Sequence, residues 1–409
     1  MNTSQELVTP DVLLALQLRS GNDRLFPRLN KFACDGVNEG FIPSIPLFLS
    51  SKIVNIKIRF AAGSPTVMVA STIARLSILC PNLECVLVTL SDLPRDPVII
   101  EAVSEMLLAC NRDVLRLFVV NSPLTEEARR VLYQLPNLQQ LWTVIQGPTS
   151  LSPMTLPNLV IINLEYDHGH EWLRGFDGAT LGRLKYANFH AKSVAAPLTN
   201  FLEEFKRVAL TTSAPSTLLR FAFRTIRLRN PDYSSLLVFK QLTELVVEFS
   251  CHNDCSSTVD DNIIIDLAEA MPKLRILQLG RPPCRVSTGI TFKGLVTLAH
   301  RCPQLTRLCV HLQVLGFSEP ASTEPPPPPK HAAIIPRMSC ALTNLQVGEA
   351  PIVQRSVMAI SFTLLQLFPQ LLNLEYANPQ WRRVVETIEL FKRIDGHVLH
   401  ASKPDLPRL

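Results

Sequence analysis

Apolar and polar positions follow two patterns along the chain, and a proline marks each change from the first pattern to the second. An apolar run with helical spacing ends in the phrase X-Pro-X-Leu, and alternating apolar residues follow it. Proline lacks an N–H and moves the preceding residue out of the α region, so each phrase predicts a helix end followed by a strand. The phrase occurs at residues 26–29, 80–83, 135–138, 156–159, 271–274, 302–305 and 368–371.

The leucine after each proline acts as the anchor of a repeat, because apolar residues recur three and five positions after it. Weaker copies without the proline obey the same rule. The full series of anchors is Leu29, Ile53, Leu83, Leu115, Leu138, Leu159, Leu181, Leu218, Leu242, Leu274, Leu305, Leu342 and Leu371. Their spacing is irregular but centred near the leucine-rich-repeat period of about 20–29 residues. The series predicts an α/β leucine-rich-repeat solenoid that is curved, with parallel strands on the concave face and helices on the convex face.

The repeats divide the chain into three expected parts. Residues 1–24 are predicted to form an N-terminal helical cap, residues 25–380 the irregular repeats, and residues 381–409 a C-terminal cap. A solenoid needs a cap at each end, since every repeat buries its apolar face only against its neighbours. Within the repeats, helices are predicted at residues 123–135, 260–271, 292–302 and 356–368.

Two segments depart from the repeat pattern. Residues 320–336 form a Pro-rich insertion, and its run Pro325–Pro329 cannot enter a helix or a sheet. This run fits a flexible exposed loop, or a ligand for an SH3- or WW-type domain. Residues 387–400 alternate apolar and polar side chains around Asp395-Gly396, which predicts a β-hairpin within the C-terminal cap.

The strand residues that face away from the core are the candidate binding residues. Side chains three and five positions after an anchor point inward, and those two and four positions after it point outward. The outward set includes Leu117, Val119, Trp142, Val144, Arg183, Lys185, Arg220, Arg224, Glu244 and Glu248. An apolar patch with one Trp beside a basic strip is typical of protein-binding surfaces, although solenoid strands also carry assorted exposed residues. The predicted protein-binding residues are Leu117, Val119, Trp142, Arg183, Lys185, Arg220 and Arg224.

Composition narrows the functional class. The formal net charge of +5 is small for 409 residues and is not gathered in a tail, so it does not favour a nucleic-acid partner. The ten cysteines follow no regular spacing, and buried, reduced thiols are the expected state. No signal peptide is visible at the N-terminus, and no apolar stretch is long enough to span a bilayer. These features predict a monomer in the cytoplasm or nucleus that binds no membrane.

Motifs for catalysis are missing from the sequence. It has no phosphate-binding loop, dinucleotide fingerprint, nucleophile elbow or His-Glu-x-x-His motif. Two clusters carry metal-ligand residue types. Cys251–Cys255 has no second pair at zinc spacing and is interpreted as a polar loop, and Asp167–Trp172 is interpreted as a solvated or partner-contacting turn. We therefore predict a protein that is not an enzyme and needs no cofactor or metal. The remote alternative is a metalloenzyme or hydrolase hosted on the loops at His168 or Cys251.

The chain resembles fungal F-box/leucine-rich-repeat proteins. The resemblance rests on Val12–Leu18 followed by Leu25–Leu29, on the repeat ends Cys/Leu-Pro-Asn-Leu, and on the charged segment Thr387–Arg393. In that family the repeats bind a substrate protein, and an N-terminal F-box module binds the Skp1 adaptor of a cullin-RING ubiquitin ligase. The resemblance thus implies the substrate-binding part of a ubiquitin ligase receptor.

The sequence departs from that family because no F-box leucine-proline helix precedes the repeats. Binding to Skp1 is therefore expected only if an F-box lies upstream. The alternative function is that of a leucine-rich-repeat scaffold or inhibitor with no link to ubiquitin.

Overall fold

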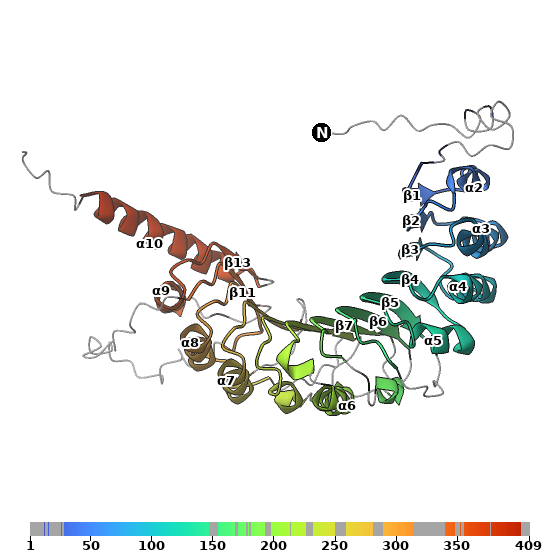
Figure 1. The fold of residues 1–409 in the computed structure, drawn as a ribbon. Helices are drawn as coiled ribbons and strands as arrows, with labels where there is room; N and C mark the ends of the chain where they lie inside the picture. Colours follow the sequence, from blue (N-terminus) through green and yellow to red (C-terminus); the bar gives the residue numbers. More distant parts are fainter. Residues whose placement is uncertain are drawn as a thin grey trace, which may run out of the picture. The chain divides into compact units, whose positions relative to one another are not determined.

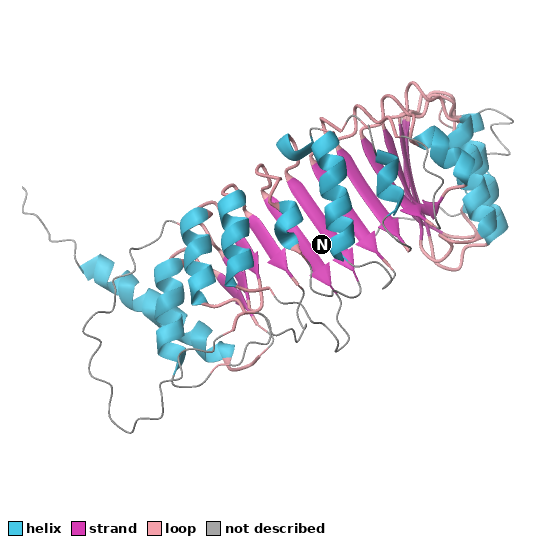
Figure 2. Ribbon diagram, turned by 90° about the horizontal axis from the view of Figure 1, so that it is seen from below, coloured by secondary structure: helices cyan, strands magenta, loops and turns pink. Residues whose placement is uncertain are grey.

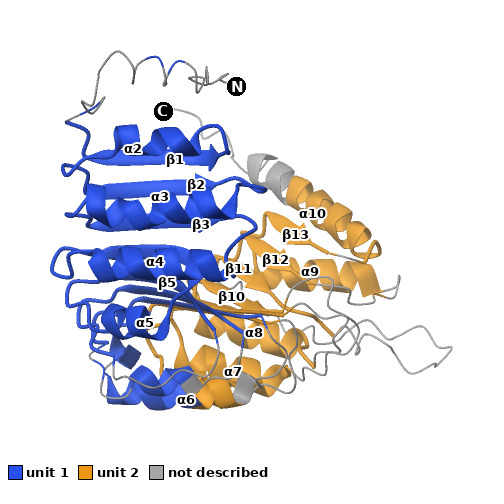
Figure 3. Cartoon of the chain, turned by 90° about the vertical axis from the view of Figure 1, so that its right-hand side faces the viewer, with its two compact units in different colours: residues 1–196, 204–218 blue, residues 197–203, 219–409 orange. Residues whose placement is uncertain are grey.

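The computed structural model describes most of the chain, which forms two compact units (Figure 3). The first unit holds residues 1–196 and 204–218, and the second holds residues 197–203 and 219–409. The described residues are 12, 15, 26, 28–146, 154–167, 171–176, 179, 181–192, 198–212, 214–225, 232–249, 259–280, 289–313, 340–347, 352, 356–376 and 378–401. Most of the predicted N-terminal cap and all of the Pro-rich insertion lie outside these residues.

In the described part of the first unit, seven strands lie side by side in chain order, and each neighbouring pair is parallel. They are β1 (Lys31–Val37), β2 (Asn55–Phe60), β3 (Cys85–Leu90), β4 (Leu117–Pro123), β5 (Gln140–Ile145), β6 (Ile161–Tyr166) and β7 (Tyr186–Ala191). The helical segments are η1 (Ile42–Ser44), α2 (Ile45–Phe48), α3 (Thr66–Leu79), α4 (Pro97–Ala109), α5 (Glu126–Leu132), η2 (Glu171–Phe176) and η3 (Ala214–Ser216). Helices α2 to α5 stack along one face of this sheet (Figures 1 and 2).

The second unit repeats the arrangement with six described strands, again parallel and in chain order. They are β8 (Arg220–Thr225), β9 (Glu244–Phe249), β10 (Ile276–Leu279), β11 (Arg307–Cys309), β12 (Asn344–Gln346) and β13 (Asn373–Glu375). The helical segments are η4 (Tyr233–Leu236), α7 (Asp261–Ala270), α8 (Phe292–Arg301), α9 (Val357–Leu367) and α10 (Trp381–Ala401), while α6 (Leu198–Thr211) contributes residues to both units. The predicted parallel pairing of the strands at Leu277–Leu279 and Leu308–Val310, each preceded by a helix, is confirmed.

The anchors explain where the strands begin. Twelve of the thirteen predicted anchors stand two residues before a strand, and all of the series except Leu29 is buried. The exception in position is Leu181, because β7 begins two residues after Leu184 instead. Both leucines are buried, so the apolar pattern alone does not distinguish them.

The X-Pro-X-Leu phrases end four helices with nearly the same backbone geometry. Cys80, Met271, Cys302 and Phe368 each follow the last helical residue and precede a proline, with φ between −132° and −117° and ψ between 63° and 71°. Their N–H groups still donate to the helix, 2.8–2.9 Å from the carbonyl oxygen four residues earlier. The proline ring keeps this residue out of the α region, and the chain then enters the next strand. These parallel strand-and-helix units define a leucine-rich-repeat solenoid.

Two aspartates bind N–H groups at the starts of α7 and α8. Asp260 caps α7 by accepting a hydrogen bond from the N–H of Ile263 at 3.0 Å, as its place before the apolar run predicts. The next carboxylate, that of Asp261, accepts from the N–H of Thr291 at 2.8 Å and from that of Gly294 at 3.2 Å at the start of α8. One repeat thereby satisfies donors of the next helix that would otherwise be left without partners.

The predicted hairpin at residues 387–400 is wrong, because α10 runs through this segment as a helix. Its buried side chains Trp381, Val384 and Ile388 recur with helical spacing, which places them on one face. Ser361 of α9 donates to the carbonyl of Val384 at 3.3 Å, so α10 packs on α9. The apolar residues at helical spacing outweigh the local turn signal of Asp395-Gly396.

Candidate protein-binding surface

The face of β1–β7 opposite the helices, which we call the strand face, carries its side chains in rows. Parallel register places one residue of each strand beside its counterpart on the next, so positions four after the anchor form a continuous row. From β2 to β7 this row consists of Lys57, Leu87, Val119, Trp142, Asn163 and Asn188.

The centre of the strand face is apolar. Trp142 is 40% exposed and has Val119 and Asn163 as its direct neighbours in the row. The half-buried side chains around it, together with Trp142, form what we call the apolar patch: Leu87, Leu117, Val119, Trp142 and Ile161. The outward orientation predicted for Leu117, Val119 and Trp142 agrees with this placement. The rule of two and four positions after the anchor also selects Leu87 and Ile161, which the list of binding residues lacked.

Val144 does not belong to this surface, although it was predicted to face outward. Its side chain is 2% exposed. The register of β4 and β5 shifts after Val119, so that Val144 pairs with Pro123. The bulge lies in β4, because β5 keeps its register with β6 and places Val144 beside Glu165. Bulges of this kind are not visible in apolar spacing.

The predicted basic strip is not a single feature of the structure. Arg183 and Lys185 are exposed, but both precede β7, because its anchor is Leu184 and not Leu181. The outward residues of β7 are Tyr186, Asn188 and His190.

Arg220 and Arg224 lie on β8, in the second unit, and each stands directly opposite a glutamate of β9. Arg220 Nε is 3.3 Å from an oxygen of Glu244, and Arg224 Nε is 2.8 Å from an oxygen of Glu248. Such pairing neutralises the local charge, and exposed pairs add only about 0–1 kcal/mol of stability.

A polar group borders the apolar patch on β6 and β7. Glu165 forms an ion pair with Lys192, and Nδ1 of His190 lies 4.0 Å from its other oxygen. The side chain of His190, and after it the hydrogen bond and charge of Lys192, lower the pKa of the Glu165 carboxyl to about 2, while partial burial opposes this lowering. The carboxyl group of Glu165 is therefore ionised at any physiological pH, and the ion pair with Lys192 balances its negative charge.

This arrangement predicts an unusually acidic carboxyl group. In a ¹³C NMR titration we expect Glu165, assigned by its loss in Glu165→Gln, to titrate near pH 2 instead of its usual 4.5. Because the folded pKa is the lower one, the carboxylate contributes its full stability above about pH 4.5, and this contribution declines as the pH falls toward 2. Lys192→Ala should move the midpoint upward, and a wild-type midpoint near 4.5 would contradict the ion pair.

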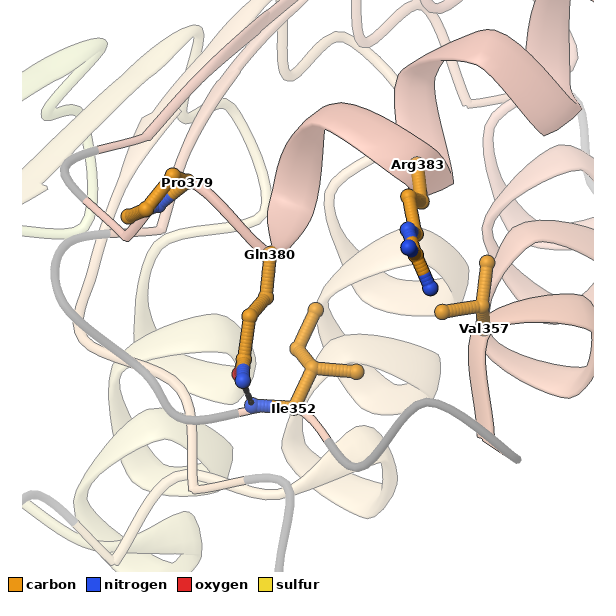
Figure 4. Close-up of a pocket in the computed structure, with 5 residues that line it drawn as sticks. All are labelled: Ile352, Val357, Pro379, Gln380 and Arg383. Atoms are coloured by element: carbon orange, nitrogen blue, oxygen red, sulfur yellow. Dashed lines mark hydrogen bonds between the residues drawn. The ribbon is translucent and has the colours of Figure 1, made fainter.

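A pocket of about 320 Å³ lies in the second unit, at the start of α10 (Figure 4). It is lined by Ile352, Val357, Pro379, Gln380 and Arg383. Gln380 accepts a hydrogen bond from the N–H of Ile352 at 3.0 Å, which links the two segments of the pocket wall that hold these residues. Among the described residues that line it, the pocket combines one cation, Arg383, with apolar and amide side chains.

The two loops considered for metal chemistry are described only in part. Cys251–Cys255 and His168–His170 lie outside the described residues. Asp167–Trp172 was interpreted as a solvated or partner-contacting turn, but Trp172 is in the core. It is 3% exposed, and its ring centroid lies 5.4 Å from that of Tyr166. Over the ranges that the structure describes, no group of three or more His, Cys, Asp or Glu side chains could hold a metal ion.

The cysteines within the described ranges are free thiols, and five of the seven are buried. Burial raises the pKa of Cys110, Cys302 and Cys309 to about 12. At neutral pH these thiols are protonated, and a protonated thiol is neither a nucleophile nor a metal ligand. The prediction of buried, reduced thiols is confirmed for this group.

No protein-family model matches the chain, and no curated protein is similar to it. Among solved structures, the chain is similar to a leucine-rich-repeat receptor in the "Crystal structure of PEPR1-AtPEP1". The two share 13% sequence identity and a TM-score of 0.26, over 85% of this chain and 52% of that chain. This chain thus spans about half the length of the structure it matches. The likeness is too weak to add to the fold assignment, which rests on the parallel repeats. In the described part of the chain, no helix is long and apolar enough to cross a membrane.

Proposed function

We propose that the protein is a non-enzymatic recognition module whose strand face binds another protein through the apolar patch. The observation that carries this proposal is Trp142, a large aromatic side chain that is 40% exposed and lies directly beside Val119 within the apolar patch. Tryptophan is enriched among the residues that contribute most of the binding energy of an interface. Such residues lie where the surrounding contacts exclude water. Half-buried Leu117 and Val119 on the adjacent strand supply such a surrounding.

The more specific form of the proposal is that the bound protein is a ubiquitination substrate. Its support is the sequence resemblance to F-box/leucine-rich-repeat proteins, in which the repeats hold the substrate. The competing form is a scaffold or inhibitor without a ubiquitin link. Affinity purification separates the two when the protein is expressed from its own gene with a C-terminal tag, so that any upstream F-box is included. Recovery of Skp1 and a cullin then favours the first form, and their absence favours the second.

The surface itself is tested by Trp142→Ala. With a partner identified by proximity labelling of the wild type, we expect this variant to weaken binding by about 30-fold, corresponding to a hot-spot loss of about 2 kcal/mol. The unfolding free energy should change by only about 0.5 kcal/mol, since an exposed side chain contributes little to the core. Isothermal titration calorimetry and thermal unfolding measure the two quantities.

The matched control is Ile78→Ala, which truncates an apolar side chain that is 74% exposed on α3. Because α3 lies on the opposite face of the sheet, this change should leave affinity unaltered. Equal affinity of Trp142→Ala and wild type would show that the partner binds elsewhere. Arg220 and Arg224 would then be the next candidates, tested by reversing both charges.

A further inference from the structure

We propose that the occupant of the strand face is an extended protein segment with acidic and apolar residues. Its carboxylates lie over β1 and β2, and its apolar side chains lie over β3 to β6. This inference rests on the proposed function and specifies the partner class. It follows from the distribution of charge on either side of the apolar patch.

The β1–β2 side of the patch carries free positive charge. Lys31 and Lys57 are exposed on the strand face, and neither forms an ion pair with any residue that the structure describes. Lys57 stands directly beside Leu87, which is the first residue of the apolar patch in the central row. Arg59 differs from them because its Nε lies 3.2 Å from a carboxylate oxygen of Asp35, which balances its charge.

Among the described residues that face outward on β6 and β7, none carries a comparable unpaired charge. Asn188 donates a hydrogen bond to Asn163, so these two amides are bonded to one another in the central row. Glu165 is neutralised by Lys192 one row away. A ligand with apolar residues over Trp142 therefore gains electrostatic attraction only if its acidic residues extend toward Lys57. This asymmetry fixes the side of the apolar patch on which the acidic residues lie, for either chain direction.

The spacing of the strands sets the spacing of the ligand residues. Neighbouring strands are about 4.8 Å apart, so the three steps from Lys57 to Trp142 span about 14 Å. An extended chain rises about 3.3 Å per residue, so an acidic residue should precede or follow the Trp142-contacting residue by about four positions. A nucleic acid is the poorer fit, because two free lysines beside an apolar patch provide few phosphate contacts.

Peptide selection tests this inference without a known partner. Peptides selected from a phage-displayed random 12-residue library on the full-length protein should carry an acidic residue about four positions from an aromatic residue or leucine. For a selected synthetic peptide, fluorescence polarisation at low salt should show at least tenfold weaker binding to Lys31→Glu/Lys57→Glu. Replacing the acidic residue of the peptide by Lys should restore binding to that variant.

The matched control is Arg75→Glu/Arg112→Glu, which makes the same charge change on exposed residues of the first unit that lie on α3 and just after α4, away from the strand rows. It should leave peptide affinity within twofold of wild type. Peptides that lose affinity in Trp142→Ala but not in Lys31→Glu/Lys57→Glu overturn the acidic-segment inference and leave the proposed surface standing. Peptides insensitive to Trp142→Ala count against the proposed surface itself. A selection that yields no peptide dependent on the two lysines also overturns the inference.

Discussion

Trp381→Ala is expected to lower the free energy of unfolding by about 3–5 kcal/mol, as truncation of a buried aromatic side chain usually does. Trp381 is fully buried at the first turn of α10, and it is among the largest buried side chains in the described structure. Val384 and Ile388 continue the same buried face, so the loss of the indole leaves a cavity where α10 meets the rest of the unit. Denaturant unfolding followed by circular dichroism measures the change.

Trp142→Ala serves as the control, because it removes the same side chain from an exposed position. Its effect on stability should be about 0.5 kcal/mol. If both substitutions cost the same, Trp381 is not part of a packed core, and α10 is not docked as the structure shows.

The second large effect is expected for Leu277→Ala, which should cost about 2–5 kcal/mol. Leu277 is fully buried at the centre of β10, between Leu245 of β9 and Leu308 of β11, both of which are also fully buried. The surrounding sheet is held by hydrogen bonds on both sides, so it cannot collapse into the space that the missing methyl groups leave. The same unfolding experiment measures this loss.

Leu372→Ala provides the comparison within the same unit, since Leu372 is 76% exposed. Truncating it should change stability by about 0.5 kcal/mol or less. A small loss for Leu277→Ala, comparable with that of Leu372→Ala, would mean that β10 is not a central strand of the solenoid.

The start of nearly every strand could be read from the sequence, because an apolar anchor stands two residues before it. At seven strands the X-Pro-X-Leu phrase adds a second local signal. The proline ends the helix, and the anchor leucine enters the core two residues before the strand, as with Cys80 and Leu83 ahead of β3. The register between strands follows from the anchors as well. The opposition of Arg220 to Glu244 could therefore have been found from Leu218 and Leu242, and so could the ion pair that neutralises the arginine.

The errors arose where a local pattern has two solutions. Leu181 and Leu184 both satisfy the apolar spacing, and only the pairing of β6 with β7 selects Leu184. The segment after residue 387 combines a turn signal with helical apolar spacing, and packing on α9 decides for the helix. Val144 is buried and pairs with the end of a bulge in β4, a property of two paired strands that neither sequence segment shows alone.

Neighbouring strands of this protein begin in register whatever the length of the connection between them. β11 and β12 pair from Arg307 and Asn344 onward, although residues 310–343 separate them, while only residues 146–160 connect β5 and β6, which are equally well aligned. Insertions and deletions in the connections therefore leave the order of side chains across the strand face intact. Over evolutionary time, the connections are free to gain or lose residues while selection acts on the exposed rows one substitution at a time. In protein design, the connections could likewise be replaced without changing the exposed strand side chains that bind the partner.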